Sequence, residues 1–353
     1  MALFNRINGK ELKERLHNSV QARTTISFYK YHQIGDPTSF RNDLYKQFEQ
    51  MQIWGRIYVA HEGINAQISI PTELFSDFKS ELYSIPFLNG IRLNVAVDDN
   101  GKSFFKLKIL VRSKIVADGL NDSTFDSSNC GVHVNANEFN TLADNPNTII
   151  VDMRNHYESE VGHFKNAICP DVDTFKDELK VVKELLGDKK DKNLLMYCTG
   201  GIRCEKASAW FKHVGFKNVF QLNGGIIEYA RQVKQQGLEN KFVGKNFVFD
   251  ERLGERISED IISECHQCGK PCDTHTNCKN DGCHLLFIQC EECAANYSGC
   301  CSQACADIIA LPIEAQKELR KGINKGRQVF KKGRAKDLKV KLTATDLTTK
   351  QVN

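Results

Sequence analysis

Two continuous apolar runs constrain the middle of this chain more than any other feature. Residues 148–153 read TIIVDM and residues 193–197 read NLLMY, which is typical of strands buried on both faces of a sheet. Helical patterns lie at 138–143, 174–186, 204–214 and 226–236. Strands that alternate with helices in this way form parallel sheets, so residues 126–240 are predicted to be a parallel α/β domain.

The first 125 residues carry a different pattern. Strands are expected at 26–31, 55–60, 64–70 and 91–97, and helices at 37–50 and 72–83. The order βαββαβ predicts a ferredoxin-like α+β sandwich, whose open sheet face would offer a surface to nucleic acid. The turn His61-Glu62-Gly63 between two of these strands is interpreted as structural rather than catalytic.

A loop with nucleophilic character follows the second apolar run. Cys198 stands directly after the strand and Arg203 opens the next helix. The loop residues between them are Thr199, Gly200, Gly201 and Ile202. A strand-to-helix turn gathers backbone N–H groups, and the helix N-terminus adds a positive field, so both lower the pKa of a thiol. We predict Cys198 as a thiolate nucleophile and Arg203 as its positive neighbour.

The surroundings of this loop resemble a rhodanese domain. Residues 151–158 (VDMRNHYE), followed by 162–164 (GHF) and Ala167, match the pattern D-x-R-x-x-x-E-x-x-x-G-H-I-x-x-A, with Phe164 in place of the β-branched residue. The resemblance implies that Cys198 carries a persulfide. Cys204, directly after the loop, would either resolve that persulfide or lie buried, and we expect the second.

Loop length narrows the chemistry. Cys198 and Arg203 enclose four residues, as in sulfurtransferases, whereas the related phosphatases enclose five. The loop is therefore expected to hold sulfur rather than phosphate. Asp152, Arg154 and His163 are expected to support the loop rather than to react. A rhodanese fold kept only as a scaffold is disfavoured, because the cysteine and the arginine are both present.

Ten of the fourteen cysteines fall between residues 265 and 305. In a chain without a secretory signal peptide, this density favours metal binding over disulfides. The two C-x-x-C pairs Cys265/Cys268 and Cys290/Cys293 supply the four thiolates of a structural zinc site. A second zinc ion, in an interleaved arrangement, would take the remaining pairs Cys278/Cys283 and Cys301/Cys305. Iron–sulfur clusters and a set of reduced structural thiols remain alternatives.

Positive charge is concentrated near the C-terminus. Residues 317–341 hold eleven Lys or Arg and two acidic residues, a net charge of +9. The charges of Asp346 and Lys350 beyond them cancel, so residues 1–316 carry a net charge of −5 and the whole chain +4. This tail suits a phosphate backbone, although a solvated end is the alternative. The candidate RNA-binding residues are Lys325, Arg327, Lys331, Lys332 and Arg334, with Phe330 as a stacking platform.

These zones predict an α/β multidomain chain with boundaries at 1–125, 126–240, 241–312 and 313–353. Apolar runs fall short of the roughly 18 residues that span a bilayer, and the N-terminus lacks a signal-peptide core, so a cytoplasmic protein is expected. Without a dinucleotide-binding fingerprint, a nucleotide cofactor is not expected.

Segments from all three folded zones together resemble one bacterial family. They are RTTISFYK (23–30), AHEGINAQ (60–67), YCTGGIRCEK (197–206), GKNFVFD (244–250) and CHQCG (265–269). They resemble the tRNA uridine-34 hydroxylase family. The resemblance implies tRNA as partner, molecular oxygen as co-substrate and hydroxylation of the wobble uridine at C5. The residues alone leave two alternatives, a persulfide sulfurtransferase and a zinc-bearing RNA-binding adaptor.

Overall fold

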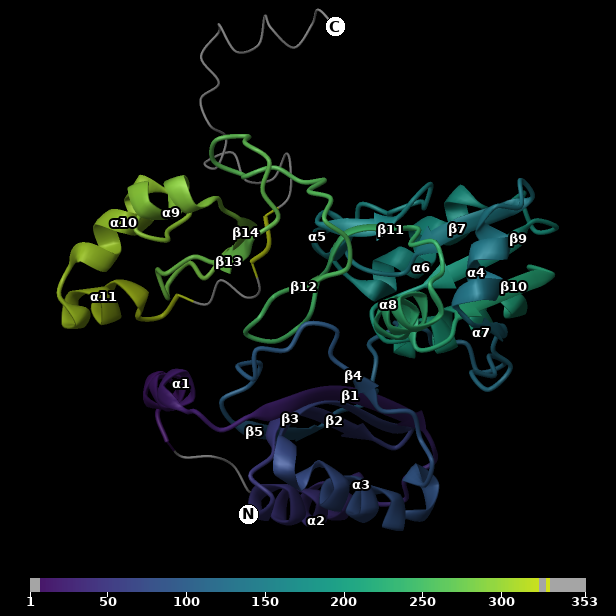
Figure 1. Cartoon of the computed structure of the whole chain (residues 1–353), viewed down its shortest axis with the longest axis horizontal. Coiled ribbons are helices and arrows are strands. Elements are labelled where there is room, and N and C mark those ends of the chain that lie inside the picture. The colour runs from purple at the N-terminus through teal and green to yellow at the C-terminus, as the bar shows by residue number, and fades with distance from the viewer. Residues whose placement is uncertain (1–6, 324–327, 331–353) are drawn as a thin grey trace, which may run out of the picture. The chain divides into compact units, whose positions relative to one another are not determined.

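The computed structural model describes residues 7–323 and 328–330 (Figure 1). The chain forms two compact units. The second unit consists of residues from 258 onward, together with the short segments Glu160–Gly162 and Val243–Lys245, and the first unit contains the rest. The boundary predicted at residue 125 falls inside the first unit and stays a prediction.

The N-terminal part of the first unit is a five-stranded sheet. Its strands are β1 (Arg23–Tyr31), β2 (Trp54–Ala60), β3 (Gly63–Pro71), β4 (Asn94–Val95) and β5 (Leu107–Val111), in the order β4-β1-β3-β2-β5. The first four strands and the helices between them follow the βαββαβ order, which confirms the ferredoxin-like sandwich. The fifth strand, parallel to β2, was not predicted, and the strand expected at 91–97 is only two residues long.

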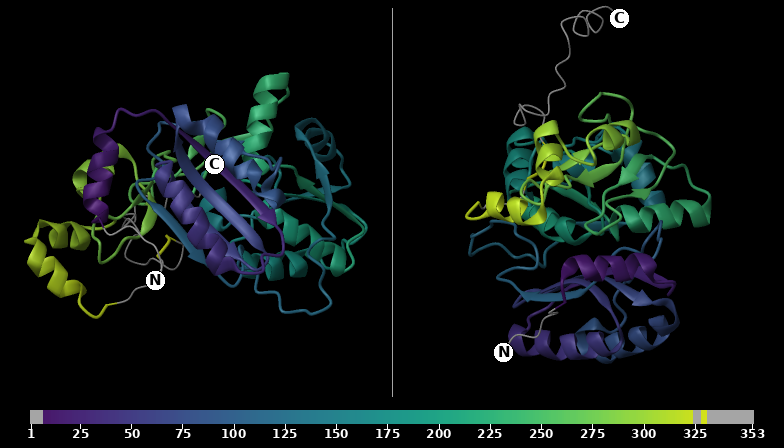
Figure 2. Two further views of the ribbon diagram at one scale, coloured as in Figure 1. Left: turned by 90° about the horizontal axis from the view of Figure 1, so that it is seen from below. Right: turned by 90° about the vertical axis from the view of Figure 1, so that its left-hand side faces the viewer.

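Helices cover one face of this sheet, as both views in Figure 2 show. They are α2 (Pro37–Gln50) and α3 (Phe75–Ser84), with the short 3-10 turns η1 (Thr72–Leu74) and η2 (Pro86–Leu88), while α1 (Gly9–Asn18) precedes the sheet. Asp36 caps α2 by accepting bonds from Thr38 N and Ser39 N. Along β1, Ile26 and Phe28 belong to the buried core under the helices, so the alternate residues face the other way.

The predicted parallel sheet is also present. Its strands are β6 (Val132–Val134), β7 (Thr148–Asp152), β9 (Asn193–Tyr197) and β10 (Asn218–Leu222), in the order β6-β10-β9-β7 and parallel throughout. The helices are α4 (Ala136–Ala143), α5 (His156–Ser159), α6 (Phe175–Leu185), α7 (Ile202–His213) and α8 (Gly225–Gln236). These helices form two separate apolar clusters with the sheet. One cluster contains Phe175 and Phe211, and the other contains Phe139 and Tyr229. Both faces of the sheet are therefore covered, as the apolar runs predicted.

A further small sheet, in the order β12-β11-β8, was not predicted. Its strands are β8 (Gly162–Phe164), β11 (Phe242–Asn246) and β12 (Glu255–Arg256).

The cysteine-rich unit has little regular structure. It contains the hairpin of β13 (His275–Asn277) and β14 (Leu286–Ile288), followed by α9 (Glu291–Asn296), α10 (Gln303–Ala310) and α11 (Ile313–Arg320). Its buried cluster has Leu285 and Phe287 as large apolar residues, and the other buried members are cysteines. So small an apolar core favours stabilisation by metal.

The end of the described chain joins this unit. Phe330 N donates to Leu286 O at 2.8 Å, and the Phe330 ring stacks on His266 with centroids 3.8 Å apart. Phe330 therefore packs within the unit rather than standing free as a platform for bases. The candidate RNA-binding residues Lys325, Arg327, Lys331, Lys332 and Arg334 lie outside the described residues. Within residues 7–323 and 328–330, helices long and apolar enough to cross a bilayer are absent.

Candidate active site and metal centres

The sulfur of Cys198 lies at the base of the predicted loop. Cys198 follows β9 and is fully buried, and Gly201 N donates to its Sγ at 3.2 Å. Gly201 adopts φ 101°, and a Cβ there would come within 2.8 Å of the Tyr29 hydroxyl, so both conformation and space require glycine. From the first turn of α8, Ile226 N donates to Cys198 O at 3.0 Å. The loop is thus held from two helices.

The environment of Cys198 favours a thiolate. Burial alone would raise its pKa, but a hydrogen bond from the Cys204 thiol, the charge of Arg203 and nearby backbone N–H groups lower the pKa to about 6. Cys204 is buried, and burial and its contact with Cys198 raise its own pKa well above the ordinary value. Cys204 therefore acts as a hydrogen-bond donor to the sulfur of Cys198.

Arg203 is less free than the sequence indicated. Its two terminal nitrogens bond both oxygens of Glu158, at 2.6 and 2.8 Å, and one also approaches the Thr199 hydroxyl at 3.3 Å. Glu158 is fully buried, so this is a bidentate ion pair shielded from water. The guanidinium group therefore pairs with the fixed carboxylate of Glu158, and its charge also lowers the pKa of Cys198. Sequence reasoning missed Glu158, although it occupies the acidic position of the D-x-R-x-x-x-E pattern.

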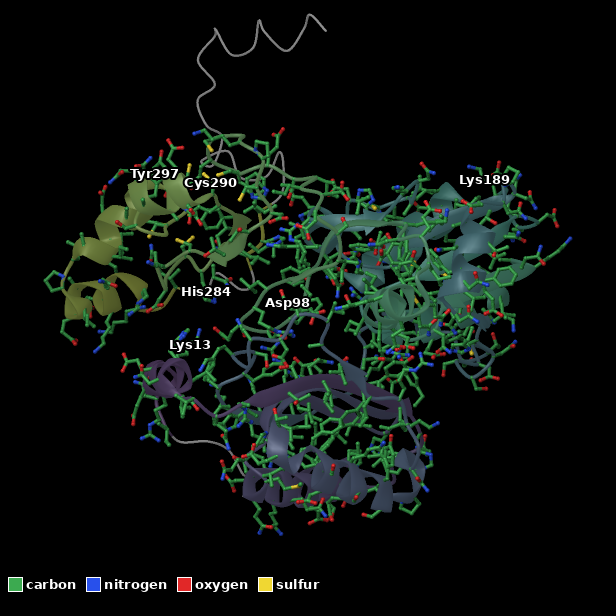
Figure 3. The ribbon with its side chains drawn as sticks, viewed as in Figure 1. Lys13, Asp98, Lys189, His284, Cys290 and Tyr297 are labelled. Atoms are coloured by element: carbon green, nitrogen blue, oxygen red, sulfur yellow. The ribbon has the colours of Figure 1, made fainter. Side chains whose placement is uncertain are left out.

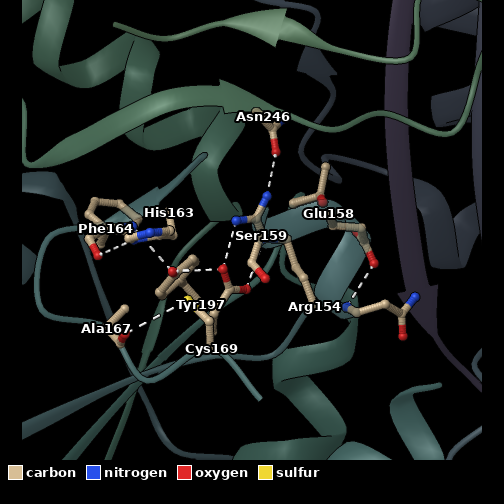
Figure 4. A network of polar contacts seen from close by, with 12 residues as sticks. Arg154, Glu158, Ser159, His163, Phe164, Ala167, Cys169, Tyr197 and Asn246 are labelled. Atoms are coloured by element: carbon tan, nitrogen blue, oxygen red, sulfur yellow. Dashed lines mark hydrogen bonds and ion pairs between the residues drawn. The ribbon is translucent and has the colours of Figure 1, made fainter. Parts of the chain in front are cut away.

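The residues expected to support the loop form a connected network (Figure 4). Arg154 donates to both oxygens of Asp152, at 2.8 and 2.6 Å, and the Tyr197 hydroxyl donates to Asp152 at 2.8 Å. Phe164 N donates to the Tyr197 hydroxyl at 3.2 Å, and Nδ1 of His163 lies 3.0 Å from Phe164 O. The network links β7, β8 and β9 at the position where the loop begins. His163 reaches it through the backbone of Phe164. Tyr197 was not predicted.

A third buried carboxyl group differs from the other two. Glu178 on α6 is fully buried, and neither of its oxygens has a hydrogen-bond partner among the described residues. Burial raises the pKa of Glu178 well above its ordinary value, and the opposing charge of Arg203 does not reverse this. Burial therefore favours the neutral, protonated form of Glu178. Each of the two buried guanidinium groups then has one carboxylate partner: Asp152 pairs with Arg154, and Glu158 pairs with Arg203.

A cavity of about 380 Å³ adjoins the loop within the first unit. It is lined by Tyr29, Lys30, Tyr31, Ile91, Arg92, Asn94, Ser127, Ser128, Cys130, Gly200, Glu205, Asn223 and Gly224. Tyr29 donates to Glu205 at 2.9 Å and Tyr31 donates to Ile202 O at 3.3 Å. The helix-free face of the N-terminal sheet, expected to be open, is thus one wall of this cavity.

One cluster at this cavity has ligand-type side chains that sequence reasoning missed. Atoms of Cys130, His133 and Glu205 lie within 4.8 Å of one another, and His133 Nε2 is 2.9 Å from Glu205 Oε1. Cys130 precedes β6, His133 lies in β6 and Glu205 lies in α7. Their spacing along the chain therefore gives no metal-binding pattern.

The cysteine-rich unit brings its predicted ligands together in two groups. One is Cys265, Cys268, Cys290 and Cys293, and the other is Cys278, Cys283, Cys301 and Cys305. Within each group all sulfur atoms lie within 4.8 Å of one another, and all fourteen cysteines of the chain are free thiols. Cys290, labelled in Figure 3, stands at the start of α9.

The sulfur spacing fits tetrahedral metal ions. The distance is 3.6 Å for Cys268–Cys290, 3.7 Å for Cys283–Cys301 and 3.8 Å for Cys301–Cys305. Zinc–sulfur bonds of about 2.3 Å in a tetrahedron separate the sulfurs by about 3.8 Å. Burial would raise the pKa of Cys265, but N–H groups, including Cys290 N at 3.3 Å, lower it to about 7. These N–H groups therefore favour the thiolate form of Cys265.

The covered parallel sheet, the six-residue loop and the network behind it define a rhodanese-like domain. Family comparison agrees, since residues 135–232 match the rhodanese-like domain, residues 23–115 the UPF0176 acylphosphatase like domain and residues 243–306 the rhodanase C-terminal family. The rhodanese-like domain from Anabaena sp. is 18% identical, with a TM-score of 0.26, over 32% of this chain and 78% of that chain.

Full-length relatives identify the particular family. A tRNA uridine(34) hydroxylase from Photorhabdus laumondii is 58% identical over 333 residues, 94% of this chain and 95% of that protein. One from Enterobacter sp. is 56% identical over 345 residues, 98% of this chain and 99% of that protein. The chain belongs to the tRNA uridine(34) hydroxylase family.

Proposed function

We propose that this chain hydroxylates the wobble uridine of tRNA at C5, with molecular oxygen as co-substrate and Cys198 as the catalytic residue. The observation that carries the proposal is a buried sulfur with a pKa lowered to about 6, in a loop whose Gly200 lines a cavity. The names of the full-length relatives supply the substrate and the reaction. A cytoplasmic location agrees with fourteen free thiols.

The chemistry starts with the thiolate. Cys198 Sγ adds to C6 of uracil, the C5=C6 double bond breaks, and its electron pair makes C5 nucleophilic towards oxygen. One oxygen atom forms the new C5–O bond. The second leaves as water, with two electrons from a thiol reductant and two protons. Loss of the C5 hydrogen as a proton then expels Cys198 and restores the double bond.

The experiment that tests this reaction is mass spectrometry of tRNA nucleosides. Purified protein, unmodified tRNA and a thiol reductant are incubated under ¹⁸O₂, and we expect wobble uridine to gain one labelled oxygen. Unlabelled product would place the source of oxygen in water and overturn the role of molecular oxygen. A gain of sulfur in a parallel reaction, with thiosulfate as sulfur donor in place of the thiol reductant, would favour a sulfurtransferase, which the loop length also suits. An unchanged uridine in both reactions would favour an RNA-binding adaptor.

Two zinc ions in the cysteine-rich unit complete the proposal. Each Cys₄ group would hold one ion, which stabilises the fold and takes no part in the reaction. Sulfur distances of 3.6 to 3.8 Å support a single ion at each site, because an iron–sulfur cluster between the ligands would spread them further. Elemental analysis of the purified chain should give two zinc ions per chain. Iron with sulfide, or a folded chain without metal, would contradict the assignment.

A further inference from the structure

Asn94 is a buried polar side chain that lines the cavity. It lies on β4 opposite Ser27 of β1, and only 5% of it is exposed. Its Nδ2 is 3.4 Å from Gly200 O in the active-site loop. Because a carbonyl only accepts hydrogen bonds, this contact fixes which end of the amide faces the loop.

The other end of the Asn94 amide has an acceptor to offer. Its Oδ1 is buried and has no hydrogen-bond partner among the described residues. A buried acceptor without a donor costs about 1–3 kcal/mol, so a ligand N–H is favoured at this position. Asn94 also lines the cavity, together with Gly200. Asn94 therefore brings a buried, unpaired acceptor to the wall of this cavity, next to the loop that carries the nucleophile.

Aromatic side chains define the walls on which a flat ring would lie. Tyr29 and Tyr31 occupy alternate positions of β1 and therefore the same face of the sheet. Their hydroxyl groups are bonded to Glu205 and to Ile202 O, and their ring planes are 68° apart. Rings held in this way lose little freedom when a nucleic-acid base packs on them.

Positive charge is also present around the cavity. Arg92 and Lys30 both line it. Phosphate groups of RNA are held by Arg and Lys side chains, whereas base edges are read by amide groups. At about 380 Å³ the cavity lies within the size range of roughly 300–1,000 Å³ that is typical of small-ligand sites. A single flipped nucleotide fits this combination of charge, aromatic walls and volume.

We propose that this cavity receives the target uracil and that Asn94 selects it by accepting a hydrogen bond from N3–H, an inference that rests on the function proposed above. Uracil carries a donor at N3, whereas cytosine carries a lone pair there. A cytosine in the same position would face Asn94 Oδ1 with two acceptors in contact. Selection of uridine over cytidine thus follows from one buried oxygen atom.

The test compares two anticodon stem-loop RNAs that differ only in U34 or C34. Their dissociation constants are measured with the full chain and with Asn94→Ala, and kcat/KM for oxygen incorporation is measured on the U34 RNA. We expect Asn94→Ala to reduce the preference for U34 over C34 about 10- to 100-fold and to lower kcat/KM by a similar factor. Asn89→Ala is the matched control, because Asn89 is exposed in the same part of the chain.

A purely structural role of Asn94, through its contact with Gly200, gives a different result. Asn94→Ala would then weaken binding of both RNAs equally and shift the titration of the Cys198 thiolate. An unchanged U34:C34 ratio overturns the inference even if the wild-type enzyme hydroxylates uridine. A wild-type chain that adds no oxygen overturns the proposed function instead, while the binding ratio still reports on the cavity.

Discussion

Two buried glutamates behind the loop should respond in opposite ways to the same substitution. Glu158→Gln removes the charge that pairs with Arg203 through bonds of 2.6 and 2.8 Å, and leaves a guanidinium group uncompensated in the interior. Breaking a buried ion pair on one side costs about 3–5 kcal/mol. For a unit of this size, roughly 2–4 °C per kcal/mol gives a fall of about 6–20 °C in the thermal midpoint.

Glu178→Gln is the matched control. Because burial favours the neutral form of Glu178, the substitution should cost no more than about 1 kcal/mol at pH 7. A carboxyl group whose folded pKa is raised loses stability as the pH rises above its unfolded pKa of about 4.3. Glu178→Gln removes that loss. The thermal midpoint of the variant minus that of the wild type should therefore increase from pH 5 to pH 8.

Differential scanning calorimetry of the full chain at pH 5, 7 and 8 measures both effects. Glu158→Gln should melt well below Glu178→Gln at pH 7. Equal midpoints for the two variants would refute the assignment of one ionised and one neutral glutamate.

Four further outcomes are expected. Cys198→Ser should abolish modification of wobble uridine in cells without lowering the thermal midpoint, and wild-type levels of product would contradict the catalytic role. The ultraviolet absorbance of the Cys198 thiolate, taken as wild type minus Cys198→Ser, should fall by half near pH 6 as the pH drops, since protonation removes the thiolate. Cys204→Ala removes a donor and should raise that midpoint, and an unmoved midpoint would exclude the bond. Removal of residues 331–353, which retains Phe330, deletes seven Lys or Arg and two Asp and should weaken tRNA binding and flatten its salt dependence without changing the modified base. Equal affinities at two salt concentrations would leave these residues without an RNA role.

The sequence predicted the elements whose pattern is local. Strands β7 and β9 and helix α2 were expected within a residue or so of their bounds, because apolar runs and the Pro37 start are read without knowledge of partners. Strand β4 was predicted too long, since it pairs with β1 at only two positions. Strand β5 was missed altogether. Its pairing with β2 depends on segments about fifty residues apart, which propensity does not report.

The candidate site was predicted only in part for the same reason. Cys198 and Arg203 belong to one loop, so their spacing was informative. Glu158 lies forty-five residues from Arg203 along the chain, and its ion pair depends on the way β7 and β9 lie together. Asn94 lies more than a hundred residues from Gly200, and alternation along one strand does not reveal what its polar face will meet.

The hairpin of β13 and β14 decides which cysteines become partners. As the chain leaves the ribosome, Cys272 and Cys278 follow Cys265 and Cys268, so the first four thiols include two that do not belong to the final group of Cys265 and Cys268. Shorter loops close at lower entropic cost, so a nascent chain is drawn towards that wrong set. Pairing of His275 with Ile288 carries the chain back and places the next cysteine pair beside the first. Loading of the two proposed metal ions with their own ligands would therefore wait until this hairpin has formed.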